Sequence, residues 1–158
     1  MGVAGSGKST VGLALAAALG WRFVDADEHH SPESVAKMAR GEPLTDADRW
    51  PWLDGLRAII AAALAANEPL VLACSALKAA YRARLVGGDA HRIRFVHLTG
   101  TPEMLRARLA GRAGHFMKAG MLASQLAALE PPDDAVTVDA ARPVDALVAE
   151  IVNRLAAA

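Results

Sequence analysis

Gly2-Val3-Ala4-Gly5-Ser6-Gly7-Lys8-Ser9 matches the phosphate-loop pattern G-x-x-x-x-G-K-[ST] at every fixed position. The glycines permit backbone conformations that are closed to other residues, so consecutive N–H groups can surround a phosphate chain. The apolar run that follows predicts a helix, whose positive end points at the same anion. A flexible Gly/Ser-rich tail is the alternative, but the lysine, the hydroxyls and the helix-prone run together favour a phosphate-binding loop.

The side chains of the loop fit ATP and Mg²⁺. Lys8 is placed to reach the β- and γ-phosphates, and the Ser9 hydroxyl is placed to ligate Mg²⁺. We therefore expect ATP to be held by the glycines and polar residues of this segment, which are Gly2, Gly5, Ser6, Gly7, Lys8, Ser9 and Thr10.

The position of the loop in the chain is unusual. A phosphate loop normally connects a buried parallel strand to a helix, yet only Met1 precedes Gly2. Such a strand lies in the middle of the sheet. Its five buried apolar side chains would contribute about 10 kcal/mol, which is comparable to the roughly 5–15 kcal/mol net stability of a whole domain. We therefore expect that the first strand is missing, that the natural protein starts upstream, and that Met1 is an internal methionine.

Composition sets modest bounds on function. A length of 158 residues suits one domain. Lys plus Arg and Asp plus Glu both number 17, so charge gives no case for nucleic acid or membrane as the main partner. Cys74 is the only cysteine, which excludes an internal disulfide and is compatible with a reducing cytosol. With no signal segment and no run of 18 apolar residues, we expect a cytoplasmic protein.

Strand-like and helix-like stretches alternate along the chain. We expect a first helix capped by Gly20, a helix with Pro51 in its first turn, and a helix that begins at Thr101-Pro102. Strands separated by helices predict a parallel sheet that is covered on both faces, with ligands at the carboxyl ends of the strands. The expected strands are residues 21–25, 70–74, 93–98 and 135–139.

Two carboxylates end the first of these strands, close to the expected position of the phosphate loop. Asp25 can hold a water of the Mg²⁺ shell, and Asp27 can orient a substrate hydroxyl, as phosphoryl transfer requires. The alternative is that Asp27-Glu28 merely opens a helix, where carboxylates suit the dipole. His29 and His30 do not indicate a transition-metal site, because adjacent side chains diverge and no second ligand cluster accompanies them.

Further blocks follow in order along the chain. They are DADEHH (25–30), KMARGEPLTDADRWPWL (37–53), ACSALK (73–78) with Tyr81-Arg82, GHFMK (114–118), and Leu122, Ser124-Gln125 and Leu129-Glu130-Pro131. In order and spacing these blocks resemble the gluconate kinase family over nearly the whole chain. The resemblance implies one P-loop NTPase domain over residues 1–158, an α/β three-layer sandwich like that of nucleoside monophosphate kinases. It also implies transfer of the ATP γ-phosphoryl group to the 6-hydroxyl of D-gluconate, and it suggests a homodimer.

Gluconate carries a carboxylate and a row of hydroxyls, so its pocket needs a planar cation and several hydrogen-bonding groups. Arg49 and Arg82 are our candidates for the carboxylate. An ion pair of Arg49 with Asp46 or Asp48 is the alternative, a surface arrangement of little energetic weight. Asp27 is the candidate that deprotonates the attacking hydroxyl. The residues expected to address the substrate hydroxyls are Asp27, His30, Ser75 and His115.

Residues 106–118 look like a mobile lid that brings an arginine onto the phosphates and excludes water. Arg108 and Arg112 are spaced to share one face of a helix end, between glycines that allow a hinge. We expect both arginines to bind ATP and Arg112 to act in catalysis. A solvated helix face explains their spacing equally well.

Three other functions stay open or are excluded. A kinase of the same fold with a shikimate-like or nucleotide acceptor would share the loop and the Asp-x-Asp pair. A truncated nucleotide-binding fragment without activity is kept open by the short start. A switch-type GTPase is excluded, because its Asn-Lys-x-Asp guanine motif does not occur in the chain.

Overall fold

The computed structural model describes residues 1–111 and 121–157. The helices are α1 (Lys8–Leu19), α2 (Pro32–Ala39), α3 (Asp46–Ala66), α4 (Ala79–Val86), α5 (Pro102–Ala110), α6 (Met121–Ala128) and α7 (Val144–Ala156), with short 3-10 helices η1 (Ala26–His29) and η2 (Ala90–Arg92). None of these helices has the length and apolar character needed to span a membrane.

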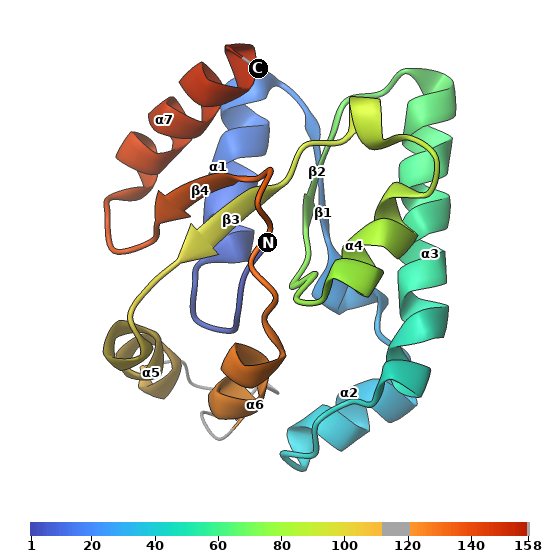
Figure 1. The fold of residues 1–158 in the computed structure, drawn as a ribbon, viewed down its shortest axis with the longest axis vertical. Coiled ribbons are helices and arrows are strands. Elements are labelled where there is room, and N and C mark those ends of the chain that lie inside the picture. The colour runs from blue at the N-terminus through green and yellow to red at the C-terminus, as the bar shows by residue number, and fades with distance from the viewer. Residues whose placement is uncertain (112–120, 158) are drawn as a thin grey trace.

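Four parallel strands form two separate pairs. β1 (Arg22–Asp25) pairs with β2 (Leu70–Ala73), and β3 (Val96–Thr99) pairs with β4 (Val136–Asp139). α1 and α7 cover one face of these strands, and α3 and α4 cover the other (Figure 1). The predicted α/β three-layer arrangement is confirmed, and α2, α5 and α6 gather near the carboxyl ends of the strands.

Met1 and Gly2 bridge the two pairs. The Met1 amino group donates to the Val96 carbonyl at 2.5 Å, and the Met1 carbonyl accepts from the Leu98 N–H at 3.0 Å. On the other side, the Gly2 N–H donates to the Ser75 carbonyl at 3.2 Å. In the described part of the chain no strand precedes α1.

Two local signals of the sequence are confirmed. Gly20 ends α1 in the left-handed conformation, with φ of 67°, which a residue without Cβ adopts without strain. The Thr101 hydroxyl accepts from the Met104 N–H at 3.3 Å and begins α5, with Pro102 as the first helical residue.

The prediction for Pro51 is wrong, because α3 begins earlier than expected. Thr45 and Asp48 form a reciprocal capping box at residue 45, so the helix starts at Asp46 and Pro51 lies inside it. The third strand also differs, since β3 starts at Val96 rather than at residue 93. Pairing with β4 decides this, because the first bond between the two segments runs from the Val136 N–H to the Phe95 carbonyl.

Two apolar clusters hold the helices on the strands. On the α1 and α7 face the buried residues include Val11, Leu15, Leu98, Val138, Leu147 and Ile151. On the α3 and α4 face they include Trp52, Leu53, Leu56, Tyr81 and Leu85. The second cluster anchors the chain segments that reach the carboxyl ends of β1 and β2, where polar side chains converge.

Candidate functional site

The phosphate loop has the backbone geometry that its glycines predict. Gly5 and Gly7 adopt φ values of 82° and 89°, in the left-handed region that favours glycine. A Cβ at Gly5 would also lie 2.9 Å from the Leu105 carbonyl oxygen. The loop therefore depends on glycine there for both conformation and space, and Gly7 leads directly into α1.

Ser9 and Asp25 meet at the end of the loop. The Ser9 hydroxyl donates to Asp25 Oδ2 at 2.5 Å, while Asp25 Oδ1 accepts from the Asp27 N–H at 3.0 Å. Such hard oxygen donors suit Mg²⁺, which usually keeps several waters and binds phosphate oxygens. In residues 1–111 and 121–157 no three His, Cys, Asp or Glu side chains converge on one point. The site thus fits an ion shared with a nucleotide better than an all-protein metal cage.

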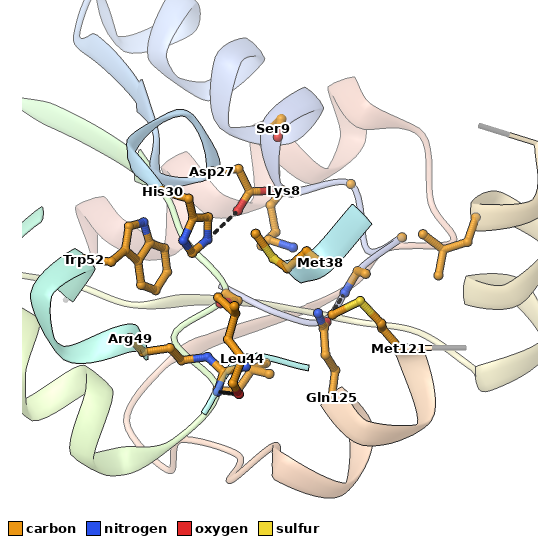
Figure 2. Close-up of a pocket in the computed structure, with 16 residues that line it drawn as sticks. Lys8, Ser9, Asp27, His30, Met38, Leu44, Arg49, Trp52, Met121 and Gln125 are labelled. Carbon is orange, nitrogen blue, oxygen red and sulfur yellow. Dashed lines mark hydrogen bonds and ion pairs between the residues drawn. The ribbon is translucent and has the colours of Figure 1, made fainter. Parts of the chain in front are cut away.

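A small cavity of about 60 Å³ opens beside the loop. Figure 2 shows the side chains that point into it from the loop, η1, α2, α3 and α6. Eight residues predicted from the sequence line it, namely Gly5, Gly7, Lys8, Ser9, Asp27, His30, Arg49 and Ser75. The sequence-predicted phosphate and acceptor residues therefore share one cavity.

Lys8 reaches into this cavity from the first turn of α1. Its Nζ donates to the Val3 carbonyl at 3.1 Å. This contact folds the side chain back along the loop (Figure 2), so the ammonium lies next to the backbone that would surround a phosphate chain.

Asp27 and His30 line the same cavity. His30 Nε2 is 4.0 Å from Asp27 Oδ1, and the His30 side chain is only 5% exposed. The ring stacks on Trp52 with centroids 4.3 Å apart, and Trp52 in turn donates to the Ala26 carbonyl at 2.8 Å. Burial lowers the pKa of His30, and the Asp27 carboxylate opposes that shift. The imidazole is therefore held neutral at pH 7.

The second ring nitrogen of His30 has no hydrogen-bond partner within residues 1–111 and 121–157. Nδ1 is buried and makes no hydrogen bond to a described residue. Buried polar atoms are normally satisfied. An unsatisfied nitrogen on a cavity wall is therefore a good place for a substrate hydroxyl to bind.

Arg49 belongs to a hydrogen-bonded network of four side chains, which are those of Arg49, Tyr81, Asp46 and Lys78. Its guanidinium donates to the Leu44 carbonyl and, at 3.4 Å, to the Tyr81 hydroxyl. The Tyr81 hydroxyl donates to Asp46, which also accepts from Lys78 at 2.8 Å. The hydrogen bond from Lys78 is the main cause that lowers the Asp46 pKa, and the bond from Tyr81 adds to it.

The ion pair weighed for Arg49 does not form. Asp46 pairs with Lys78, and Asp48 pairs with Lys37 at 2.8 Å. Arg49 therefore lines the cavity without a direct ion pair to Asp46 or Asp48.

The structure adds lining residues for which no role was predicted. Gln125 Oε1 accepts from the Ala4 N–H at 2.7 Å and so ties α6 to the phosphate loop. Met38, Leu44 and Met121 form a small buried cluster on the rim. Gln125 belongs to a block that resembles the gluconate kinase family, but nothing in its spacing indicated a contact with the loop.

Several predicted residues are not brought to the cavity. The Arg82 guanidinium donates to the carbonyls of Ala76, Leu77 and Glu130, and it does not line the cavity. The Gly2 N–H donates to the Ser75 carbonyl. This glycine therefore supports the loop without lining the cavity. Thr10 is exposed on α1.

The predicted lid falls partly outside the described residues. Arg112, His115 and the lid segment after Gly111 lie there, so their roles stay predictions. Arg108 is described, and its guanidinium donates to the Ala140 carbonyl at 2.7 Å. A Cβ built on Gly7 would lie 3.8 Å from Arg108 Nη1. Arg108 therefore lies beside the loop, as its proposed contact with ATP requires.

Comparison with known proteins places these features in a family. A family model described as an AAA domain matches residues 1–132. The gluconokinase of Gluconobacter oxydans (strain 621H) is 44% identical over 160 residues, which cover 99% of this chain and 89% of that protein.

Two solved structures are similar over almost the whole chain. The gluconokinase of Sinorhizobium meliloti 1021 has a TM-score of 0.85 at 46% identity, covering 99% of this chain and 89% of that one. An unliganded sugar kinase from Janibacter sp. HTCC2649 has a TM-score of 0.90 at 43% identity, covering 98% and 91%. The similarity therefore extends over nearly the whole chain.

Proposed function

The chain belongs to the gluconokinase family, and from this membership we propose that it transfers the γ-phosphoryl group of ATP to the 6-hydroxyl of D-gluconate. The observation that carries the proposal is the single cavity in which Lys8 and the loop face Asp27, His30 and Arg49. A phosphate donor and a polyol acceptor can meet there without any rearrangement of the sheet.

Charge neutralisation is the main task of the phosphate side. Phosphoryl transfer leaves little covalent chemistry to the protein, so catalysis depends on positioning and electrostatics. The loop N–H groups and the Lys8 ammonium stabilise charge on the transferring group, and Ser9 and Asp25 would hold the Mg²⁺. When bound, that ion neutralises charge on the β- and γ-phosphates.

The acceptor side positions the nucleophile. Asp27 accepts the proton of the attacking hydroxyl, as a general base must. The neutral His30 ring offers its free Nδ1 to a second hydroxyl, and Ser75 adds a further hydrogen-bonding group on the wall. Arg49 binds the carboxylate of gluconate, because a guanidinium matches the geometry of that group.

Substrate entry requires the residues on the rim of the cavity to move. A cavity of about 60 Å³ holds a few water molecules, less than a six-carbon acid requires. Met38 and Met121 on the rim have flexible side chains that repack easily. The proposal therefore includes movement of α2 or α6 when gluconate binds.

The direct test is an acceptor panel. The purified chain is given ATP and Mg²⁺ with gluconate, with other sugar acids, with shikimate or with nucleosides, and the phosphorylated product is identified by mass spectrometry. Formation of 6-phosphogluconate with gluconate as the best acceptor supports the proposal. A preference for shikimate or a nucleoside, or ATP binding without transfer to any acceptor, would replace it with one of the alternatives raised by the sequence.

Substitution of Arg49 by lysine is expected to raise KM for gluconate by about 10- to 100-fold, since it removes a charge-assisted hydrogen bond worth roughly 1.5–3 kcal/mol. KM for ATP should stay within about twofold, because Arg49 lies on the acceptor wall. Tyr81→Phe, which removes one support of the guanidinium, should raise the same constant by a smaller factor. Steady-state kinetics with each substrate varied in turn measures both effects.

The matched control is Arg84→Lys. Arg84 pairs with Asp54 on the exposed side of α4 and does not line the cavity, so both KM values should stay as in the unmodified chain. An Arg49→Lys variant with an unchanged KM for gluconate would remove Arg49 from the carboxylate site.

The remaining parts of the proposal are coarser. A small-molecule acceptor, ATP with Mg²⁺ and a cytoplasmic location fit a kinase of this family, and the homodimer and the lid over residues 106–118 stay predictions. The lid would bring Arg108 and Arg112 onto the phosphates and keep water from competing as acceptor.

A further inference from the structure

One peptide group of the phosphate loop, between Val3 and Ala4, is held at both of its ends. Its N–H, which belongs to Ala4, donates to Gln125 Oε1 at 2.7 Å, and Figure 2 shows Gln125 reaching from α6 into the cavity beside the loop. Its carbonyl, which belongs to Val3, accepts from Lys8 Nζ at 3.1 Å and from the Ser6 N–H at 3.3 Å. A side chain of α6 and the lysine of the loop therefore bond to opposite ends of one rigid planar unit.

This peptide group is buried together with its partner on α6. The exposed fractions of Val3, Ala4 and Gln125 are 4%, 7% and 8%. A buried N–H that loses its acceptor bears the cost of its lost hydration, and rotation of the peptide plane is a direct way to reduce that cost. The Gln125 oxygen satisfies the Ala4 N–H and so stabilises one orientation of the plane. The same bond fixes the direction of the Val3 carbonyl.

The direction of the Val3 carbonyl matters because this oxygen aims the Lys8 ammonium. A lysine side chain is a flexible four-carbon stem that carries a point charge, so its position depends on what the ammonium contacts. An ammonium has three N–H donors, and Lys8 can therefore keep the carbonyl contact while it donates to phosphate oxygens. The carbonyl is a fixed point for the charge, and Gln125 determines where that point lies.

Apolar packing holds α6 against the loop at this place. Leu122 lies one turn before Gln125 on α6 and is buried in a cluster that also contains Val3, Ala4 and Leu105. The loop and the helix therefore share one apolar contact beside their hydrogen bond. This packing keeps the Gln125 oxygen within reach of the Ala4 N–H.

The chain that follows α6 is anchored by Glu130. Its N–H donates to the Leu77 carbonyl at 2.9 Å, and its carboxylate accepts from the Ala79 N–H at 2.5 Å. Its carbonyl accepts from the Arg82 guanidinium at 2.8 Å. These bonds tie the end of α6 to the start of α4. Arg82, which does not line the cavity, thus helps to hold the helix that carries Gln125.

We propose that Gln125 is a positioning residue for Lys8, which it orients through the peptide group between Val3 and Ala4. This inference rests on the proposed kinase function and gives α6 a part in it. A misplacement of about 1 Å at a reacting centre can slow catalysis about 100-fold, so the orientation of this one peptide group affects transfer. If Gln125 only stabilised the fold, its removal would lower the melting temperature, and its effect on turnover would not depend on Lys8.

The test compares three substitutions of Gln125 in the full chain. Gln125→Met keeps the approximate length of the side chain and removes the acceptor oxygen. Gln125→Asn keeps the amide but is one methylene shorter, so its oxygen does not reach the Ala4 N–H. Gln125→Glu keeps an acceptor oxygen at the original length. Ser124→Ala is the matched control, because Ser124 is exposed on the same helix and does not line the cavity.

We expect Gln125→Met and Gln125→Asn to lower the turnover number by about 10- to 100-fold and to speed hydrogen exchange at the Ala4 amide. Gln125→Glu and Ser124→Ala should stay within about threefold of the unmodified chain. Turnover is measured with the acceptor that the panel above identifies. A variant that combines Lys8→Met with Gln125→Met should match Lys8→Met alone within about twofold, because a residue that acts through Lys8 has no further effect once the ammonium is gone.

A further tenfold loss in the combined variant would overturn the proposal, because Gln125 would then act independently of Lys8. Unchanged turnover in Gln125→Met, or turnover in Gln125→Glu as low as in Gln125→Met, would overturn it as well. If Gln125→Met does not fold, Gln125→Asn takes its place. If no acceptor is phosphorylated, the proposed function fails, and the same double-mutant cycle is run on the dissociation constant for ATP. Gln125→Met must then add nothing to the effect of Lys8→Met, and a further weakening would overturn the assignment of Gln125.

Discussion

Replacement of Asp27 by asparagine lowers turnover of gluconate by about 10²- to 10⁴-fold, the range expected for loss of a general base. Asp27 lies on the cavity wall with a side chain that is 29% exposed, within 4.0 Å of the His30 ring. The amide has the same shape but cannot take the proton of the attacking hydroxyl. Single-turnover measurement of 6-phosphogluconate formation isolates the chemical step from product release.

ATP binding should survive the same substitution. The loop glycines and Lys8 do not depend on the Asp27 carboxylate, and the backbone N–H of residue 27, which bonds to Asp25, is retained. The dissociation constant for ATP, measured by calorimetry, should therefore change by less than about threefold. Glu28→Gln is the matched control, since it removes an exposed neighbouring carboxylate that does not line the cavity. Near-normal turnover in Asp27→Asn would rule out the assigned role.

The elements that local chemistry defines were predictable from the sequence. The phosphate loop, the Gly20 cap and the Thr101 cap depend on a few adjacent residues, and each is found where the pattern placed it. The start of β3 was not, because its first residue, Val96, pairs with Val136, which lies 40 positions away at the start of β4. A long-range ladder, rather than the apolar run from residue 93, decides where that strand begins.

The cavity was predictable in its polar residues and not in its packing. Asp27, His30 and Arg49 were chosen for their chemistry, and all three line it. Arg82 carries the same guanidinium group as Arg49, but that group donates hydrogen bonds to three carbonyl oxygens. The sequence around Arg82 does not reveal those partners. The contact of Gln125 with Ala4 spans 121 positions, so no local pattern indicated that α6 supports the loop.

Replacement of Lys8 by methionine should lower the turnover number by about 10³-fold at saturating ATP and gluconate. This is the scale of losing one preorganised charge in phosphoryl or acyl transfer. Methionine keeps the length and apolar stem of the side chain and is tolerated in a helix, so α1 and the loop should keep their structure. Lys37→Met is the matched control, since Lys37 pairs with Asp48 and does not line the cavity.

A comparison of the turnover number with KM for ATP decides what Lys8 does. Its Nζ contacts the Val3 carbonyl, next to the loop amides, so it can serve the ground state, the transition state or both. A charge that acts only on bound ATP would raise KM for ATP and leave the turnover number unchanged. A charge that follows the γ-phosphoryl group toward the acceptor lowers the turnover number itself. Because Asp27 and Lys8 line the same cavity, a loss of turnover in both variants with ATP affinity largely kept would place the transferring group close to both side chains.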